Sequence, residues 1–339
     1  MLRKFGILVT VLFTVGAAIL TWPDFFRLEL TFPMAQVISF RALITLGFAA
    51  LLLVFLLLAL ARPVRAFALS LVLVTVLALI ANVAMIVARG TGVQTLPPKT
   101  PTSVRVMTWN TAGDATSAET IAQTAVAMGA DIVSLPETTI DTGEAVAVAM
   151  RELGQPMWAY HTEYGTDGWA ADSTTLLITP DLGTYSVIAS SKDGSSNTST
   201  VPSAVAMPVD GDGPIVVAAH AVAPREVTMD DWRRDLQWLA DQCSTPNVIV
   251  AGDFNATTDH MTRLGVDGGT LGRCTDAATR TGNGAVGTWP TTLPALAGAP
   301  IDHVMAGRDW TPTGSVVLTS FDGVGSDHRP LVVQLERSR

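Results

Sequence analysis

The sequence predicts an α/β domain that follows a membrane region of three transmembrane helices. Hydrophobic residues make up 48% of the 339 residues, and the excess is concentrated in the first 90. Beyond them, apolar strand patterns alternate with helix patterns, which is typical of an α/β fold. Several of these strands end in a carboxylate, amide or imidazole side chain, and α/β proteins form their sites at such strand ends.

The membrane region is expected in residues 1–89, and its apolar runs are 5–22, 37–61 and 66–88. Each run can cross a bilayer core of about 30 Å as a helix, which takes about 20 residues. A cleaved signal peptide is the alternative for the first run. Its end is a poor cleavage site, however, and two further runs follow. Arg41, near the start of the second run, is expected to extend its side chain to the membrane surface.

Basic residues beside the runs predict the orientation. Arg3 and Lys4 precede the first run, and Arg62 and Arg65 lie between the second and third. Positive residues are retained on the cytoplasmic side of a membrane. We therefore expect a multi-pass protein of the cell membrane with a cytoplasmic N-terminus. Three spans then place everything after Arg89 in the extracellular space.

The only two cysteines, Cys243 and Cys274, lie in the part expected outside the cytoplasm. A single pair in an exported domain suggests a disulfide, and two free thiols are the alternative. Their spacing does not match a metal site.

Charge also separates the two parts of the chain. Residues 1–98 hold seven of the 21 basic residues and two of the 30 acidic ones, so the remainder carries 14 basic and 28 acidic residues. A formal charge of −14 repels the phosphate backbone of nucleic acid, unless a bound metal or a local basic patch overrides it. Nucleic acid is thus a less favoured partner.

The Pro- and Gly-rich stretch 90–103 is expected to be a linker, and residues 104–339 a catalytic domain. The expected helices cover 117–128, 142–153 and 228–242. Residues 257–300 are expected to form long loops. The expected strands are 104–109, 132–135, 157–160, 174–179, 185–189, 201–207, 215–219, 248–251, 301–305, 316–319 and 331–335.

The stretch Val248–Asn255 is the clearest example of a predicted strand that is followed by candidate site residues. Four apolar residues predict a buried strand. Gly252 is then expected to let the backbone turn. Asp253 and Asn255, two residues apart, would point the same way if the strand continues.

Polar residues of the same kind follow other apolar strands. The full set is Asn110, Glu137, His220, Asp253, Asn255, Asp302, Asp327 and His328. Clustered carboxylates repel one another and are costly to bury, and a divalent cation removes that cost. Because the available ligands are rich in oxygen, Mg²⁺ is the expected cofactor, with Mn²⁺ or Ca²⁺ as alternatives.

The motifs around these residues, in chain order, are Trp109-Asn110, Leu135-Pro136-Glu137, Ala219-His220, Gly252-Asp253-Phe254-Asn255, Thr288-Trp289-Pro290, Ile301-Asp302-His303-Val304 and Ser326-Asp327-His328-Arg329-Pro330. This series resembles the signature of the endonuclease/exonuclease/phosphatase superfamily, which includes DNase I-like nucleases, neutral sphingomyelinases and inositol polyphosphate phosphatases. The resemblance covers about residues 104–337. It implies a four-layer sandwich, in which two packed β-sheets are flanked by helices.

The resemblance also implies roles for the acidic and amide residues. Glu137 would be the principal metal ligand, with Asn110 beside it. Asp327 would orient the site or contact the metal. Asp253 would orient or deprotonate the attacking water, and Asn255 would help to hold this water and the phosphate.

The histidines are expected to divide between the site and other positions. By the resemblance, His328 would contact the scissile phosphate, Asp302 would hold its tautomer, and His220 would be a candidate acid for the leaving oxygen. His303 is expected to face away from Asp302. The remaining two, His161 and His260, are expected in loops, solvated or in contact with substrate.

These features predict a membrane-anchored, extracytoplasmic, metal-dependent phosphoesterase acting on a phosphodiester or phosphomonoester. Its substrate could be lipid-linked or belong to the cell envelope. One alternative is an extracytoplasmic DNase I-like nuclease, although residues 161–174 lack the basic character of a DNA-gripping loop. The other is a non-catalytic surface binding module, which the intact set of polar residues argues against.

Overall fold

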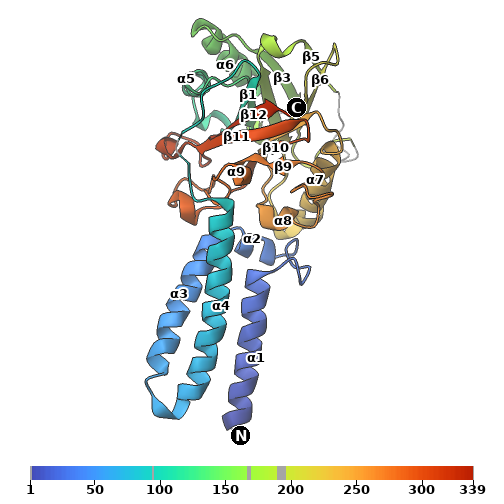
Figure 1. Ribbon diagram of the computed structural model, residues 1–339. Coiled ribbons are helices and arrows are strands. Elements are labelled where there is room, and N and C mark those ends of the chain that lie inside the picture. The colour runs from blue at the N-terminus through green and yellow to red at the C-terminus, as the bar shows by residue number, and fades with distance from the viewer. Residues whose placement is uncertain (1, 94, 166–168, 189–195, 339) are drawn as a thin grey trace.

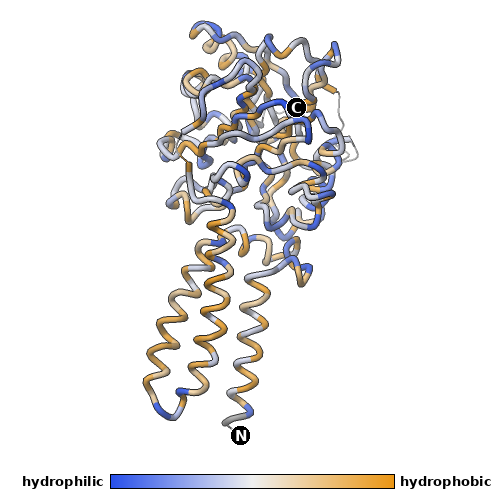
Figure 2. The backbone as a smooth tube through the Cα atoms, in the orientation of Figure 1, coloured by the Kyte–Doolittle hydropathy of each residue, from blue (hydrophilic) through white to orange (hydrophobic). Residues whose placement is uncertain are grey.

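The computed structural model describes residues 2–93, 95–165, 169–188 and 196–338. A bundle of long helices projects from one side of an α/β domain (Figure 1). Within these described residues, three helices are long and apolar enough to cross a membrane: α1 (Leu2–Thr21), α3 (Arg41–Leu58) and α4 (Arg65–Arg89). Figure 2 shows apolar residues along their length and hydrophilic residues at the turn between α3 and α4.

The second membrane segment is shorter than its apolar run predicts. Residues 34–38 form a separate short helix, α2 (Met34–Ile38), and the chain turns at Ser39 and Phe40 before α3 begins. Helix α2 lies at the base of the domain (Figure 1), and its Ala35 is buried in the same apolar cluster as residues of the domain.

The described part of the domain forms two six-stranded sheets. The first has the order β11-β12-β1-β2-β4-β3 and the second β5-β6-β7-β8-β10-β9. The bounds in the first sheet are β1 Ser103–Thr108, β2 Ile132–Pro136, β3 Trp158–Glu163, β4 Ser173–Ile178, β11 Trp310–Val317 and β12 Leu331–Arg337. Those in the second are β5 Tyr185–Val187, β6 Ala204–Pro208, β7 Ile215–His220, β8 Val248–Asp253, β9 Thr275–Asp276 and β10 Asp302–Ala306.

The sheets pack face to face and helices cover their outer faces. A shared apolar core joins Val106 of the first sheet to Ile249 of the second. Helices α5 (Ala118–Met128) and α6 (Ile140–Glu152) pack on the first sheet, and α7 (Met229–Gln242) packs on the second. This arrangement confirms the predicted sandwich of two sheets flanked by helices.

Two parallel strand pairs at the centre of the sheets position the polar strand ends. Strand β1 pairs with β2, and β7 pairs with β8. Between the sheets, Ser134 Oγ of β2 donates a 2.7 Å hydrogen bond to the carbonyl oxygen of Ala251 in β8. The two pairs therefore lie against each other, and the chain segments that follow them emerge at one end of the sandwich.

Several elements differ from the sequence-based expectations. The region 257–300 is not only loop, because it contains α8 (Thr258–Met261), β9 and α9 (Ala277–Arg280). These elements have two to four residues, too few to show a periodic pattern. Strand β11 begins at Trp310, earlier than predicted. The sequence did not reveal its first half, because positions there alternate between buried and exposed around a bulge.

Gly252 serves a different purpose from the turn that the sequence suggested. It lies within β8, and a Cβ there would approach the carbonyl oxygen of Ala219 on β7 to 1.9 Å. The glycine is therefore required by the close contact between the two parallel strands.

The two cysteines form a disulfide, with their Cα atoms 5.3 Å apart. Cys243 directly follows α7, and Cys274 directly precedes β9. The bridge thus ties the end of the covering helix to the edge of the second sheet.

The stretch expected to be a linker is partly attached to the domain. The N–H of Gly92 donates to the carbonyl oxygen of Gly282 at 3.0 Å, and Lys99 forms an ion pair with Asp131 at 2.6 Å. The division into residues 1–89, 90–103 and 104–339 stays a prediction.

Candidate active site

Polar residues gather where the two parallel strand pairs end. Asn110 follows β1, Glu137 directly follows β2, and His220 and Asp253 are the last residues of β7 and β8. The β7–β8 register places His220 opposite Asp253, and the β8–β10 register places Asp302 opposite Asp253. The regular pairing of the strands thus brings together residues that are far apart in the sequence.

Two amide side chains hold the carboxylates. Asn110 donates from Nδ2 to Glu137 Oε1 at 2.9 Å and to Asp253 Oδ2 at 3.1 Å. The side chain of Asn255 donates from Nδ2 to Asp253 Oδ2 at 3.3 Å, and its backbone N–H donates to Asp253 Oδ1 at 2.8 Å. Because the amide nitrogen of Asn110 faces both carboxylates, a role as a metal ligand would require its amide to turn over. Asn110 thus acts here as a bridge between two acids.

Two of these residues have strained backbones. Glu137 has φ 55° and Asn255 has φ 47°, both in the left-handed region that favours glycine. A non-glycine residue there costs about 1 kcal/mol or more. The N–H of Gly113 donates to the carbonyl oxygen of Glu137 at 3.1 Å, which helps to hold the turn after β2. The fold therefore maintains strain at positions that aim a carboxylate and an amide into the site.

His328 is held as a cation between carboxylates. Its Nδ1 lies 2.8 Å from Asp302 Oδ2, and its Nε2 lies 3.8 Å from Asp253 Oδ2. Burial alone lowers the pKa of His328, but the charges of Asp302 and Asp253 outweigh burial and raise the pKa to about 10. The imidazole therefore carries a proton at neutral pH, with Asp302 fixing its orientation.

Asp253 is nearly inaccessible, with 1% of its surface exposed. Burial and the neighbouring charge of Asp302 raise the pKa of Asp253, while His328 and the hydrogen bonds from Asn255 and Asn110 oppose the rise. A carboxylate with a raised pKa is a better proton acceptor than an exposed one.

His220 also lies in the site but differs in charge. Its Nε2 is 3.7 Å from Glu137 Oε1. Burial, together with the nearby positive charge of His328, lowers the pKa of His220 to about 3. The ring is therefore neutral at pH 7, and its role as an acid stays a prediction.

Asp327 stands at the exposed rim of the site. Its Oδ1 is 4.0 Å from Nε2 of His328, and its side chain is 55% exposed. Trp289 donates from Nε1 to Asp327 Oδ2 at 2.8 Å. The ring of Phe40, from the turn between α2 and α3, lies 6.1 Å from the ring of Trp289. Sequence reasoning missed Phe40, because no local pattern connects it to the domain.

Two further residues of the last motif support the site. Ser326 donates from Oγ to the carbonyl oxygen of Asn110 at 2.6 Å and accepts from the N–H of His328 at 3.0 Å. Arg329 is fully buried and pairs with Asp322, and it also donates to carbonyl oxygens of residues 287–293. Both were visible in the motif, but nothing local showed what they contact.

The donor set fits a divalent metal. Ligand atoms of Asp253, Asp302 and His328 lie within 4.8 Å of one another, and because the protonated ring of His328 cannot bind a metal, the carboxylate oxygens are the available donors. The predicted ligands differ, since they were Asn110, Glu137 and Asp327; Glu137 joins this group through Asn110. Among the described residues, Oδ1 of Asp302 is a buried atom without a hydrogen-bond partner. An unpartnered carboxylate oxygen among carboxylates suits a hard cation.

The other histidines were only partly predicted. His303 faces away from the site as expected, since its ring nitrogens contact Asp276 and the carbonyl oxygen of Ala256. His161 lies in β3 and His260 in α8, so the expectation of loops was wrong for both. His260 is fully buried, because its ring packs against Trp232 and Nε2 contacts the carbonyl oxygen of Ala35 in α2.

Solved structures resemble this domain. An endonuclease/exonuclease/phosphatase from Beutenbergia cavernae superposes with a TM-score of 0.52 at 18% identity, over 70% of this chain and 72% of that one. A humanized TDP2 from D. rerio gives a TM-score of 0.51 at 15% identity, over 69% of this chain and 99% of that one. At such identities the likeness shows the fold alone. No curated protein matches the sequence.

The sequence profile of the Endonuclease/Exonuclease/phosphatase family matches residues 107–328. That range begins inside β1 and ends at His328, so it includes every predicted site residue. It also covers more than half of the chain. The chain therefore belongs to the endonuclease/exonuclease/phosphatase family.

Proposed function

We propose that this protein is a membrane-anchored phosphoesterase that hydrolyses a phosphodiester or phosphomonoester outside the cytoplasm with the help of a divalent metal ion. Members of the family are usually phosphoester hydrolases and depend on a divalent metal. The observation that carries the proposal is the position of His328. Its imidazolium, held by Asp302, lies 3.8 Å from Asp253, and Asn110 links Asp253 to Glu137.

The residues divide the chemistry between them. Glu137 and Asp302 offer oxygens that would hold Mg²⁺ or Mn²⁺, which would supply positive charge to the phosphoryl oxygens. Asp253 can take a proton from an attacking water, because its pKa is raised. The imidazolium of His328 can donate to a phosphoryl oxygen and stabilise the charge that develops there. Asn255 would help to hold this water and the phosphate.

Two observations support an extracytoplasmic domain. Basic residues flank the N-terminal end of α1 and lie in the turn between α3 and α4, which favours the cytoplasm for those ends. The disulfide between Cys243 and Cys274 is typical of an oxidising compartment. A reporter enzyme fused after Arg89 should be active only outside the cytoplasm. Reporter activity only in the cytoplasm would show that the orientation is the opposite one.

A lipid-linked or envelope phosphoester is the favoured substrate class. The three membrane helices keep the domain beside a bilayer, and residues 99–339 carry a formal charge of −14, which disfavours nucleic acid. A nuclease is the alternative, since one similar structure is a D. rerio TDP2 complexed with a single-strand DNA product (TM-score 0.50, 13% identity). The third candidate function is a surface binding module without activity. That function would not explain the strained backbones of Glu137 and Asn255.

One assay separates these functions. The full-length protein in detergent, with Mg²⁺ or Mn²⁺, should hydrolyse bis-p-nitrophenyl phosphate. Removal of the metal with EDTA and the Glu137→Gln variant should each abolish turnover. Glu144→Gln is the matched control, because Glu144 is exposed on α6 away from the site. Absence of metal-dependent turnover on any phosphoester would favour the binding module, and faster cleavage of plasmid DNA than of lipid esters would favour the nuclease.

A further inference from the structure

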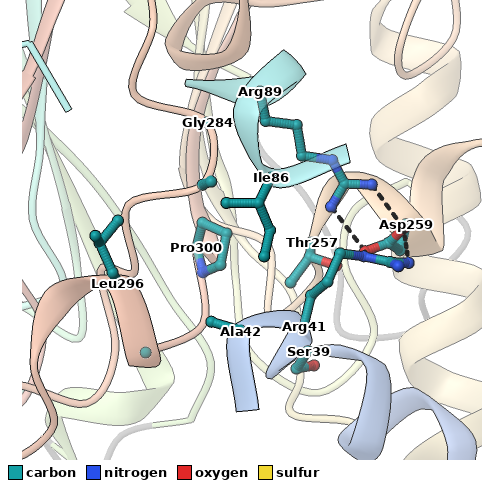
Figure 3. A pocket seen from close by; sticks show the side chains of 12 residues that line it. Ser39, Arg41, Ala42, Ile86, Arg89, Thr257, Asp259, Gly284, Leu296 and Pro300 are labelled. Atoms are coloured by element: carbon teal, nitrogen blue, oxygen red, sulfur yellow. Dashed lines mark hydrogen bonds and ion pairs between the residues drawn. The ribbon is translucent and has the colours of Figure 1, made fainter. Parts of the chain in front are cut away.

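A second charged cluster lies where the membrane helices meet the domain. We call it the junction cluster, and it consists of Arg41, Arg89 and Asp259. Arg41 is the first residue of α3, Arg89 is the last residue of α4, and Asp259 belongs to α8. Figure 3 shows both guanidinium groups directed at the one carboxylate, in a cleft that is also lined by Ile86 and Pro300.

Each arginine makes two hydrogen bonds to Asp259. Arg41 donates from Nη2 to Oδ1 at 2.6 Å and from Nε to Oδ2 at 3.0 Å. Arg89 donates from Nη2 to Oδ1 at 2.6 Å and from Nη1 to Oδ2 at 2.8 Å. Paired bonds of this kind fix the relative orientation of two groups, as well as their distance.

The cluster is shielded from solvent. The side chains of Arg41, Arg89 and Asp259 are 6%, 17% and 8% exposed. Burial alone would raise the pKa of Asp259, but the two guanidinium groups outweigh it and hold the pKa well below its ordinary value. The sequence suggested only that Arg41 extends to the membrane surface, and the structure adds a partner for it, a carboxylate of the domain.

The same network joins all three membrane helices. Arg41 also donates from Nη1 to Asn82 Oδ1 of α4 at 2.8 Å and to the carbonyl oxygen of Thr21 of α1 at 3.3 Å. Asn82 donates in turn to Thr21 Oγ1 at 3.1 Å. A single carboxylate of the domain is thus connected to α1, α3 and α4.

Backbone contacts reinforce the junction. The N–H groups of Gly284 and Ala285 donate to the carbonyl oxygens of Arg89 and Gly90 at 2.9 and 3.0 Å. Gly90 has φ 87°, and a Cβ there would meet Gly282 at 2.2 Å. The chain therefore leaves α4 already attached to the domain, and no free linker separates the described parts at this point.

The junction lies beside the rim of the active site. Phe40, directly before Arg41, contacts Trp289, and Trp289 donates to Asp327 beside His328. Several aromatic side chains of the segment between α1 and α2 are exposed, as is typical of residues at a membrane surface. They are Trp22 (48% exposed), Phe25 (80%) and Phe32 (49%). The membrane surface and the rim therefore lie on the same side of the domain.

The segment 255–257, which follows β8, has hydrogen bonds of its own outside the cluster. The side chain of Asn255 donates to the carbonyl oxygen of Ala221 at 3.0 Å, and His303 contacts the carbonyl oxygen of Ala256 at 2.8 Å. The N–H of Thr257 donates to Nδ1 of His260 at 2.7 Å. Loosening the cluster should therefore change the orientation of the domain before it changes the chemistry.

We propose that Arg41, Arg89 and Asp259 are positioning residues, which lock the domain onto the membrane helices with the rim of its active site at the bilayer surface. The lock presents the site to a phosphoester whose apolar part stays in the same bilayer. This inference rests on the proposed hydrolytic function. The cluster itself touches neither the substrate nor the reacting atoms.

Two esters with the same reacting group test the proposal. The full-length protein is reconstituted in phosphatidylcholine vesicles with Mg²⁺ or Mn²⁺. It is given ethyl p-nitrophenyl phosphate, which is soluble, or hexadecyl p-nitrophenyl phosphate, which inserts into the vesicles. Arg89→Gln is the chosen variant, because Asp259 keeps Arg41 as a partner and one buried cation then faces one buried carboxylate. We expect turnover of the hexadecyl ester to fall about tenfold, turnover of the ethyl ester to stay within about twofold, and Arg89→Lys to restore part of the loss.

Arg65→Gln at the other end of α4 is the matched control and should change neither rate, because Arg65 is exposed. Equal losses on both esters in Arg89→Gln would overturn the proposal, and so would unchanged rates on both. Failure of the wild-type protein to hydrolyse either ester would instead count against the proposed function. A circular dichroism spectrum and a melting curve of each variant show whether it is folded. If Arg89→Gln unfolds, Arg89→Lys alone decides, through a lower ratio of hexadecyl to ethyl turnover.

Discussion

The active site and the junction cluster are two buried groups of charges with opposite designs. In the junction cluster, two guanidinium groups share one carboxylate, and all three residues belong to helices. In the site, carboxylates outnumber the cationic His328. The site also contains two buried atoms without partners among the described residues, His220 Nδ1 and Asp302 Oδ1.

The difference indicates what each group is for. Buried charges that satisfy one another hold parts of a protein in a fixed arrangement, because removing one partner leaves the other uncompensated. Buried charges with unpartnered atoms and strained backbones need a ligand to complete them, and they cluster at functional sites. Substitutions should therefore affect activity in the site and stability in the junction cluster.

The largest effect is expected from Asp253→Asn. Turnover of bis-p-nitrophenyl phosphate should fall by about 10³-fold or more, because the proton acceptor is lost. The melting temperature should stay the same or rise, since the substitution removes a buried carboxylate that faces Asp302. Parallel kinetic and melting measurements check both. A large fall in the melting temperature would show that the site stabilises the fold, as the junction cluster is expected to do. The contrast between the two groups would then be wrong.

Asp259→Asn should act in the opposite way. It leaves two buried guanidinium groups without a carboxylate, which should lower the free energy of unfolding by about 3–5 kcal/mol. Chemical denaturation in detergent measures this loss. The matched control is Asp230→Asn, because Asp230 is 82% exposed on α7 and its ion pair should contribute little. Equal stability of the two variants would show that the junction cluster is not a structural lock.

The disulfide provides a reference that belongs to neither cluster. Replacing Cys243 and Cys274 together by serine opens a loop with a sequence separation of 31 residues. The free energy of unfolding should fall by about 2–4 kcal/mol. Turnover per folded molecule and the ratio of the two ester rates should both be unchanged. A change in either would connect this edge of the second sheet to one of the two clusters.

His260 makes the stability of the junction depend on pH. Burial lowers the pKa of His260 to about 4, and its neutral ring accepts from Thr257 and donates to Ala35. As the pH falls from 6.5 to 4, the unfolded chain binds a proton that the folded protein excludes. Stability should therefore decline over this range, by up to about 3 kcal/mol at pH 4.

Melting curves of the wild-type protein and His260→Gln between pH 7 and pH 4 isolate this effect. The difference in stability between the two proteins should shrink as the pH falls, because only the wild-type protein loses the contribution. A difference that stays constant with pH would mean that His260 does not titrate as an isolated buried group.

Much of the fold and the grouping of the site residues could be predicted from the sequence, because both depend on local patterns. Apolar runs of four or five residues identified the central strands, and the polar residue after each run identified Glu137, His220 and Asp253. Parallel pairing of such strands places their ends together, so proximity followed from the strand directions. The roles of these residues stay predictions.

The junction could not be predicted, because its contacts join residues far apart in the sequence and its elements are short. Helix α8 has four residues, so Asp259 and His260 resembled ordinary loop residues. Arg41 resembled a basic residue at the end of a membrane span, and no local pattern indicates that its partner is an acid in another region. The contact of Phe40 with Trp289 was unpredictable for the same reason.

The attachment of Gly90 and Gly92 to residues 282–285 has a practical consequence for anyone who wishes to cut the chain there. A fragment that begins after α4 would expose the carboxylate of Asp259, the ring of His260 and the backbone N–H groups of Gly284 and Ala285, all of which the helices cover in the intact protein. Such a fragment would have an exposed polar and apolar surface through which its copies could associate. A water-soluble version would have to redesign that face as well as omit the helices.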